Sequence, residues 1–146
     1  PYFATDTDPE VAAHVTILKE RMEADNLYFF TSWDDFQYKE PVNIILTEVI
    51  EHNTPAQATA LVKKCLSLNF HKLVITTPDS RFNAYYFEEG EESRRHEDHH
   101  FEWTDVEFQS FIKESVGALP LTYTFYGIGD RINGVTPTQA VVITRK

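Results

Sequence analysis

Hydrophobic positions along the chain alternate between short apolar runs and patterns with helical spacing. The apolar runs favour strands because they are rich in β-branched and aromatic residues and are bounded by polar turns. The predicted strands cover 2–4, 27–31, 42–46 and 72–76. A helix is predicted from Pro9 to Ala24, with Asp8 as its N-cap, and another begins at Pro55. Alternation of strand and helix is typical of an α/β fold.

The last third of the chain has a different pattern. Thr104 and Glu107 form a predicted capping box at the start of a helix. The strands predicted at 121–126 and 139–144 follow without room for a helix between them, which indicates an antiparallel hairpin at one edge of the sheet. With no internal repeat or linker in the sequence, residues 1–146 are predicted to form a single domain with a mostly parallel sheet.

Two segments of the predicted fold have unusual character. The run Val-Asn-Ile-Ile-Leu at 42–46 is almost continuously apolar, which suits a strand covered on both faces. The segment 79–101 is polar, acidic and aromatic without a clear period. It is too long for a connecting turn and is interpreted as a functional or lid-like segment.

Imidazoles and carboxylates gather in two places. If the chain turns helically after Leu46, the side chains of Glu48, Glu51 and His52 lie on one side and supply half of a coordination sphere. The second group lies in the run Arg95–Thr104, which follows about 45 residues later. Three imidazoles there are candidates for the missing ligand, and spacing does not choose among them: His96, His99 and His100.

The ligand types restrict the metal. Carboxylate and imidazole without thiolate suit manganese, magnesium or iron better than a structural zinc. The alternative for the first cluster is a solvated helix start, in which Glu48 stabilises the helix dipole. The alternative for the second is an exposed loop in which arginines form weak pairs with glutamates. That alternative pairs Arg94 and Arg95 with Glu91, Glu92 or Glu97.

Charge and cysteine content limit the partners and the compartment. A net charge of -10 argues against broad binding to nucleic acid or anionic membrane. Any RNA contact should be small and local, with Lys63, Lys64, Arg94 and Arg95 as candidates. The one cysteine, Cys65, excludes an internal disulfide and is predicted to be a buried thiol, which suggests a reducing, cytoplasmic compartment. No apolar stretch is long enough to cross a bilayer.

The string Asp98–Thr104, together with Glu48–His52, resembles the signature of the small-RNA 3′-terminal 2′-O-methyltransferase family. The resemblance continues through Thr76-Thr77-Pro78, Asn83 and Pro137-Thr138-Gln139 in the same order, covers the chain from about residue 40 onward, and is closest to the bacterial-type branch. It implies a Rossmann-like S-adenosylmethionine methyltransferase fold. It also implies a 3′ end of single-stranded or small RNA as substrate.

The resemblance assigns roles to individual residues. It implies Glu48, Glu51, His52 and His99 as ligands of one Mn²⁺ or Mg²⁺ ion. His100 then lies beside the ligands, either as a catalytic proton acceptor or as a group that supports a ligand. The implied reaction transfers a methyl group from S-adenosylmethionine to the 2′-hydroxyl of the 3′-terminal nucleotide. A metal held on the terminal hydroxyls would act as a Lewis acid and orient the 2′ oxygen.

The donor side departs from the family pattern. Asp6 resembles the carboxylate that binds the donor's ribose, and Ser32 and Asp34 belong to a segment like the one that flanks the adenine. The glycine-rich turn of such folds is missing, because all five glycines lie in the second half: Gly90, Gly117, Gly127, Gly129 and Gly134. We therefore expect 1–146 to be an N-terminally truncated domain whose first strand and glycine loop lie upstream, with further domains or an RNA-repair partner protein. The alternatives are a noncatalytic module that binds metal and RNA ends, and an unrelated metallohydrolase.

Overall fold

A computed structural model describes residues 1–6, 8–88 and 94–145, which form two compact units, Pro1–Lys39 and Glu40–Lys146. In the first unit, β1 and β2 pair in parallel, with Tyr2 opposite Leu27. Its elements are β1 (Tyr2–Thr5), α1 (Pro9–Arg21), β2 (Leu27–Phe30) and the 3₁₀ turn η1 (Trp33–Asp35). Asp8 caps α1 by accepting from the Glu10 amide, as the sequence predicts. Among the described residues, no helix is long and apolar enough to span a membrane.

Aromatic packing, rather than a helix core, occupies the interior of the first unit. Phe3 stacks on Tyr28 and Phe30, with ring centroids 5.5 Å and 6.0 Å apart. Helix α1 has no buried residue among those described, and Met22, directly after its last residue, is 73% exposed. The helical pattern of this segment therefore predicts its conformation correctly but not its burial.

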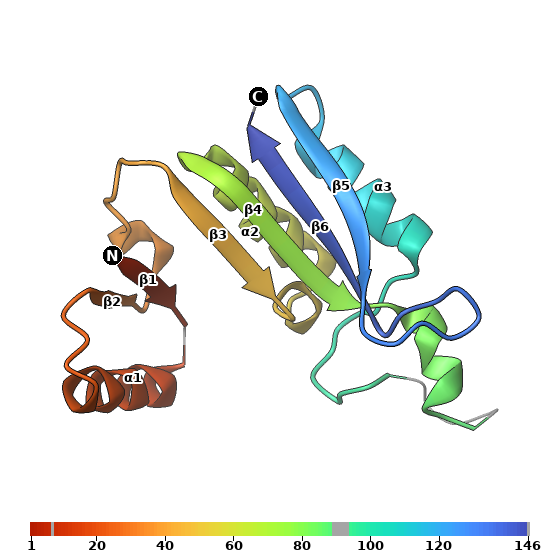
Figure 1. Cartoon of the computed structure of the whole chain (residues 1–146), viewed down its shortest axis with the longest axis horizontal. Helices are drawn as coiled ribbons and strands as arrows, with labels where there is room; N and C mark the ends of the chain where they lie inside the picture. Colours follow the sequence, from red (N-terminus) through yellow and green to blue (C-terminus); the bar gives the residue numbers. More distant parts are fainter. Residues whose placement is uncertain (7, 89–93, 146) are drawn as a thin grey trace. The chain divides into compact units, whose positions relative to one another are not determined.

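The second unit is built on a four-stranded sheet in the order β3-β4-β6-β5. Its elements are β3 (Val42–Thr47), η2 (Ile50–His52), α2 (Pro55–Ser67), β4 (Phe70–Pro78), η3 (Ser80–Tyr85), α3 (Asp105–Val116), β5 (Leu121–Ile128) and β6 (Thr138–Arg145). Strands β3 and β4 are parallel, whereas β6 is antiparallel to both β4 and β5. This arrangement confirms the antiparallel hairpin at one edge (Figure 1).

One face of this sheet carries the core. Helices α2 and α3 lie on the same side of the sheet (Figure 1). The fully buried side chains there include Val62, Cys65, Leu73, Ile75, Phe108, Ile112, Val141 and Ile143. In β3, Ile44 and Leu46 are buried, but Ile45 is 66% exposed. The expectation that this strand is covered on both faces is therefore wrong for the described chain, because its side chains alternate between core and open face.

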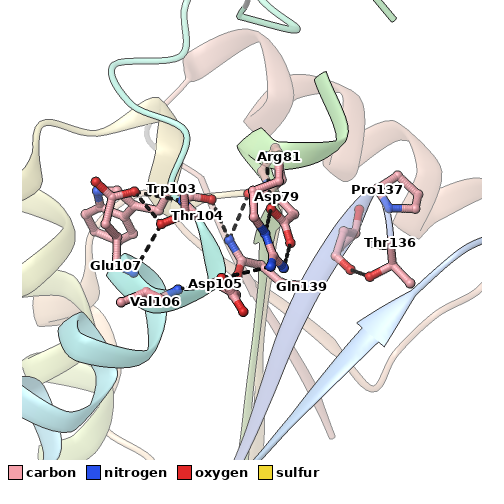
Figure 2. Close-up of polar contacts among 12 residues, drawn as sticks. Asp79, Arg81, Trp103, Thr104, Asp105, Val106, Glu107, Thr136, Pro137 and Gln139 are labelled. Atoms are coloured by element: carbon pink, nitrogen blue, oxygen red, sulfur yellow. Dashed lines mark hydrogen bonds and ion pairs between the residues drawn. The ribbon is translucent and has the colours of Figure 1, made fainter. Parts of the chain in front are cut away.

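The start of α3 carries the predicted capping box. The Thr104 hydroxyl accepts from the Glu107 amide, and the Glu107 carboxylate accepts from the Thr104 amide at 2.8 Å (Figure 2). These hydrogen bonds hold the pKa of Glu107 below its ordinary value. The capping box fixes the point at which the chain leaves the histidine-rich segment, Arg95–Thr104, and enters α3.

Removal of the cap should destabilise the second unit. We expect Thr104→Ala to lower the free energy of unfolding by about 1 kcal/mol, because one amide at the helix start loses its acceptor. Thr59→Ala is a suitable control, since the Thr59 hydroxyl lies inside α2, where it donates to the Pro55 carbonyl. Urea unfolding of the two variants measures the difference; equal losses would contradict a capping role.

The buried cysteine predicted from the sequence is confirmed. Cys65 lies on the sheet-facing side of α2 with no exposed surface, and burial raises the pKa of its thiol to about 12. Because only the thiolate reacts with disulfide reagents, we expect no labelling of Cys65 by Ellman's reagent in the native protein at mildly alkaline pH. Rapid labelling should follow denaturation. Rapid reaction of native Cys65 would show that α2 opens readily.

Candidate metal centre

The end of β3 brings Glu48, Glu51 and His52 toward the carboxyl end of the parallel strands. The sequence argument placed a helical turn directly after Leu46, and the structure has no such turn there. Glu48 instead has a left-handed backbone with φ of 53°, and the helical turn η2 begins at Ile50. Helical spacing therefore brings together only Glu51 and His52, which lie in η2. Glu48 lies before η2, and its backbone is in a strained conformation.

Glu51 is a fully buried carboxylate with one unsatisfied oxygen. Its Oε2 accepts from the Thr77 hydroxyl at 3.0 Å, whereas Oε1 has no hydrogen-bond partner among the described residues. Burial raises the pKa of Glu51, and the negative charge of Glu48 adds to this effect. A buried acceptor without a partner is costly, and a bound cation is one way to satisfy it.

Glu51, His52 and His99 form one cluster. Each offers a ligand atom, and these atoms all lie within 4.8 Å of one another. The rings of His52 and His99 meet edge to face, with centroids 4.7 Å apart. Residues distant in the sequence thus place one carboxylate and two imidazoles around a common point, which is a donor set suited to a divalent metal.

A carboxylate orients each of these imidazoles. The Nδ1 atom of His52 lies 2.9 Å from Asp98 Oδ2, and the Nδ1 atom of His99 lies 2.6 Å from Glu102 Oε1. Because a carboxylate accepts, the shared proton belongs on Nδ1, and Nε2 of each ring keeps its lone pair for a metal. Carboxylate–histidine pairs of this kind fix the tautomer and the ring orientation in metal sites.

The two orienting carboxylates are held in their charged form. Burial acts to raise the pKa of Glu102, but hydrogen bonds from Asn83, His99 and the Arg95 amide outweigh it and lower the pKa. Desolvation likewise acts to raise the pKa of Asp98, and hydrogen bonds with His96 and His52 lower it below the ordinary value. Both carboxylates are therefore acceptors at neutral pH.

The other predicted site residues of this region lie beside the cluster. Glu48 is not part of the group within 4.8 Å, and its Oε1 accepts from the Thr76 hydroxyl at 2.8 Å. The His96 side chain is 63% exposed and contacts Asp98. His100 is exposed, and its amide donates to the Glu51 carbonyl at 2.8 Å. The geometry therefore favours His99 among the three histidines. The metal-ligand roles of Glu48, Glu51, His52 and His99 and the catalytic role of His100 stay predictions.

Contacts beyond the ligands anchor the histidine-rich segment on the sheet. Gln139 of β6 donates to the carbonyls of Pro78 and Trp103, at 3.1 Å and 2.8 Å (Figure 2). Arg81 donates to both carboxylate oxygens of the buried Asp79, at 3.0 Å and 2.6 Å, and also pairs with Asp105 at the start of α3. The sequence argument assigned no role to Asp79, Arg81 or Gln139. The only feature that could have indicated one is their position, just after β4 for Asp79 and Arg81 and at the start of β6 for Gln139.

Arg95 was missed in a different way. It was expected to contact RNA or to pair with acidic neighbours, of which Glu91 and Glu92 lie outside the described residues. Within the described part of the chain, its guanidinium donates to Asn83, Pro137 and Asp79, and the expected contacts stay predictions. A polar loop residue thus acts as a structural cross-link, which no local pattern predicts.

The predicted donor-binding residues lie in the first unit. Asp6 follows β1 as expected, is exposed, and accepts from the Asp8 amide at 2.9 Å. Ser32 is exposed beside η1. Asp34 belongs to η1, and its side chain lies outside the described part of the chain. Their role in donor binding stays a prediction.

Solved structures share the fold of this chain. A chain of the Pnkp1/Rnl/Hen1 RNA repair complex is 67% identical over 99% of this chain, with a TM-score of 0.88. The small RNA methyltransferase HEN1 is 23% identical over 99% of this chain, with a TM-score of 0.82. This chain belongs to the Hen1 family. The methyltransferase domain of bacterial CtHen1-C, 24% identical over 98% of this chain with a TM-score of 0.73, agrees in fold.

The Hen1 relatives are longer than this chain. It spans 32% of the matched chain in the repair complex, 20% of HEN1 and 76% of the CtHen1-C domain. The fold is the Rossmann-like fold of S-adenosylmethionine methyltransferases, as predicted. No protein-family model and no curated protein matches the chain. The prediction that residues 1–146 form a truncated single domain stays a prediction.

Proposed function

We propose that this chain carries the acceptor half of a metal-dependent methyltransferase, which transfers a methyl group from S-adenosylmethionine to the 2′-hydroxyl of the 3′-terminal nucleotide of RNA. The observation that carries the proposal is the cluster of Glu51, His52 and His99, with ligand atoms within 4.8 Å of one another. Membership of the Hen1 family supports the same reaction class.

The residues present fit a divalent metal. Glu51 offers a buried oxygen without a partner, and both imidazoles have Nδ1 engaged and Nε2 available. Glu48 would complete the set, since its other carboxylate oxygen, Oε2, is not the one that accepts from Thr76. A bound Mn²⁺ or Mg²⁺ would supply Lewis acidity to hydroxyls of the terminal ribose.

The protein's own contribution is orientation and proton acceptance. Buried Glu51 and His99 set a fixed side of the site, while His52 is partly open to solvent and leaves an approach for a ligand. We propose His100 as the group that receives the 2′ proton, because it is exposed and its main chain is bound to the Glu51 carbonyl. Recognition of a ribose end through a metal requires few phosphate contacts, which suits a chain of net charge -10.

The first unit would hold the methyl donor. In this proposal the Asp6 carboxylate accepts from the donor's ribose, and Ser32 and Asp34 flank its adenine. The position of Asp6 directly after β1 supports this assignment, because ligands of open α/β sheets bind beyond the carboxyl ends of strands.

We also propose that the protein works with RNA-repair partners. The 67% identical relative was solved in a complex of Pnkp1, Rnl and Hen1. A methyltransferase that acts on 3′ ends would find its substrate where RNA ends are repaired.

Methyl transfer tests the proposal directly. The full-length protein should label RNA that ends in 2′,3′-hydroxyls when given labelled S-adenosylmethionine and Mn²⁺, and should not label RNA with a 2′-deoxy end. Label on both RNAs would exclude the terminal 2′-hydroxyl as acceptor. RNA cleavage with metal alone and no methyl donor would instead identify a metallohydrolase.

A further inference from the structure

Arg95 holds together three segments that lie far apart in the sequence. Its Nε donates to Asn83 Oδ1 at 2.7 Å, its Nη1 to the Pro137 carbonyl at 2.6 Å, and its Nη2 to the Asp79 carbonyl at 2.7 Å. The guanidinium carbon also lies 5.1 Å from the centre of the Tyr86 ring. The residue therefore ties the histidine-rich segment to the end of β4, to η3 and to the chain that enters β6.

The same residue contacts the group that orients His99. The Arg95 amide donates to Glu102 Oε1 at 2.7 Å, and this oxygen also accepts from His99 Nδ1 at 2.6 Å. Asn83, which accepts from the Arg95 side chain, donates to the other Glu102 oxygen at 2.5 Å. Arg95, Asn83 and Glu102 thus form a closed ring of hydrogen bonds, and His99 is attached to it.

These contacts leave little of the guanidinium for another ligand. Each of its three nitrogens already donates to the protein, and each distance is 2.6 or 2.7 Å. Without replacing one of these bonds, a phosphate would find only the second N–H of Nη1 and the second N–H of Nη2. The expectation that Arg95 contacts RNA phosphate stays a prediction, whereas its three bonds show a role within the protein.

We propose that Arg95 is a positioning residue that fixes the His99 imidazole, through Asn83 and Glu102, in the orientation that offers Nε2 to a metal. This inference rests on the proposed metal site. Lysine cannot substitute, because its single ammonium lacks the planar fork that reaches three acceptors in different directions. Loss of the fork frees the segment that carries Glu102 and His99, although neither residue is itself changed.

The test uses Arg95→Lys in the full-length protein, with Arg145→Lys as a matched control. Arg145 also donates to main-chain carbonyls, those of Leu66 and Leu68, and lies 4.6 Å from the Phe70 ring centre. The control therefore loses similar chemistry at the start of β4, whereas the Arg95 contacts lie beyond its end. Two readouts are used: ¹⁵N-histidine NMR in EDTA, which reports the His99 Nδ1 proton, and the Kd for Mn²⁺ from calorimetry.

We expect wild type and Arg145→Lys to show a His99 Nδ1 proton that exchanges slowly with water. In Arg95→Lys this proton should exchange rapidly, and the Kd for Mn²⁺ should rise about 10- to 100-fold, as is typical when an outer-shell partner is lost. Asn83→Ala, which opens the ring but keeps two of the Arg95 bonds, should show a smaller change in the same direction. Asn83→Ala also tests the proposal if Arg95→Lys fails to fold.

Two results would overturn the proposal. One is an unchanged His99 signal and Mn²⁺ affinity in both variants with a raised KM for RNA, which would make Arg95 an RNA contact. The other is an equal effect of Arg145→Lys on both readouts, which would make the loss general destabilisation. Because the NMR readout needs no metal, a wild-type protein with a protected His99 proton that fails to bind Mn²⁺ would refute the metal site and leave the positioning role standing.

Discussion

Glu51→Gln is expected to be more resistant to thermal unfolding than the wild type in EDTA, and yet to lose methyl transfer. The wild-type carboxylate is fully buried, and one of its oxygens has no partner among the residues that the structure describes, so its negative charge destabilises the metal-free fold. Glutamine keeps the shape and the hydrogen bond from Thr77 but carries no charge. The same change removes a ligand, so Mn²⁺ affinity should fall by about 100-fold or more, since even outer-shell losses cost 10- to 100-fold.

The pH dependence gives this prediction a sign. Because burial raises the pKa of Glu51, the folded protein binds this proton more tightly than the unfolded chain does. Proton binding by Glu51 stabilises the folded protein fully below the pKa that Glu51 has in the unfolded chain. This stabilisation disappears as pH rises through the pKa that Glu51 has in the folded protein. The advantage of Glu51→Gln in EDTA should therefore be small in mild acid and should grow toward neutral pH.

Glu107→Gln provides the opposite control. The pKa of Glu107 is lowered by its hydrogen bonds at the start of α3, so the wild-type carboxylate stabilises the fold above its unfolded pKa and this contribution is lost as pH falls. This variant should be less stable than wild type at neutral pH and nearly equal to it in acid.

Differential scanning fluorimetry across pH, with and without Mn²⁺, measures both variants. A Glu51→Gln protein that is less stable than wild type in EDTA at every pH would show that the buried charge is satisfied within the protein.

His99→Ala is expected to abolish metal binding, whereas His96→Ala is expected to change it by only a few-fold. The two histidines lie three residues apart, and sequence alone left both as candidate ligands. His99 is 7% exposed and held by Glu102, whereas the His96 side chain is 63% exposed. Loss of His99 removes a ligand outright, so Mn²⁺ affinity and methyl transfer should fall by about 100-fold or more.

Electron paramagnetic resonance of free Mn²⁺ measures affinity for each variant, and methyl transfer at saturating Mn²⁺ separates binding from rate. The exposed His14 on α1 is a neutral control, because its change removes an imidazole from the other unit. Equal losses for His96→Ala and His99→Ala would mean that the metal is bound at the exposed side of the segment.

Much of the fold follows from local pattern. Proline at the first helical position and threonine at the cap place the starts of α2 and α3 correctly, because these residues act within one turn of chain. The hairpin at the sheet edge follows from the short distance between two strand-like runs. Exposure of Ile45 and of α1 was not predictable in this way, because burial depends on what the rest of the molecule covers.

The site was predictable in its residue types but not in its geometry. Motif resemblance brought Glu51, His52 and His99 together, and the structure places their ligand atoms close to one another. The left-handed backbone of Glu48 left no local signal, because glutamate gives no indication of positive φ. The cross-link by Arg95 depends on carbonyls of distant segments, and main-chain acceptors leave no trace in the residue types that carry them.

The two glutamates are held by neighbouring residues of β4. Thr76 donates to Glu48 and Thr77 donates to Glu51, and successive side chains of a strand point to opposite faces of the sheet. The pair therefore approaches the carboxyl end of β4 from its two sides. Exchange of one apolar side chain for another along 73–75 should be tolerated, but insertion or deletion of a single residue there would send each hydroxyl to the wrong face. We therefore expect the stability of the site to depend on the length of this strand more than on its apolar composition.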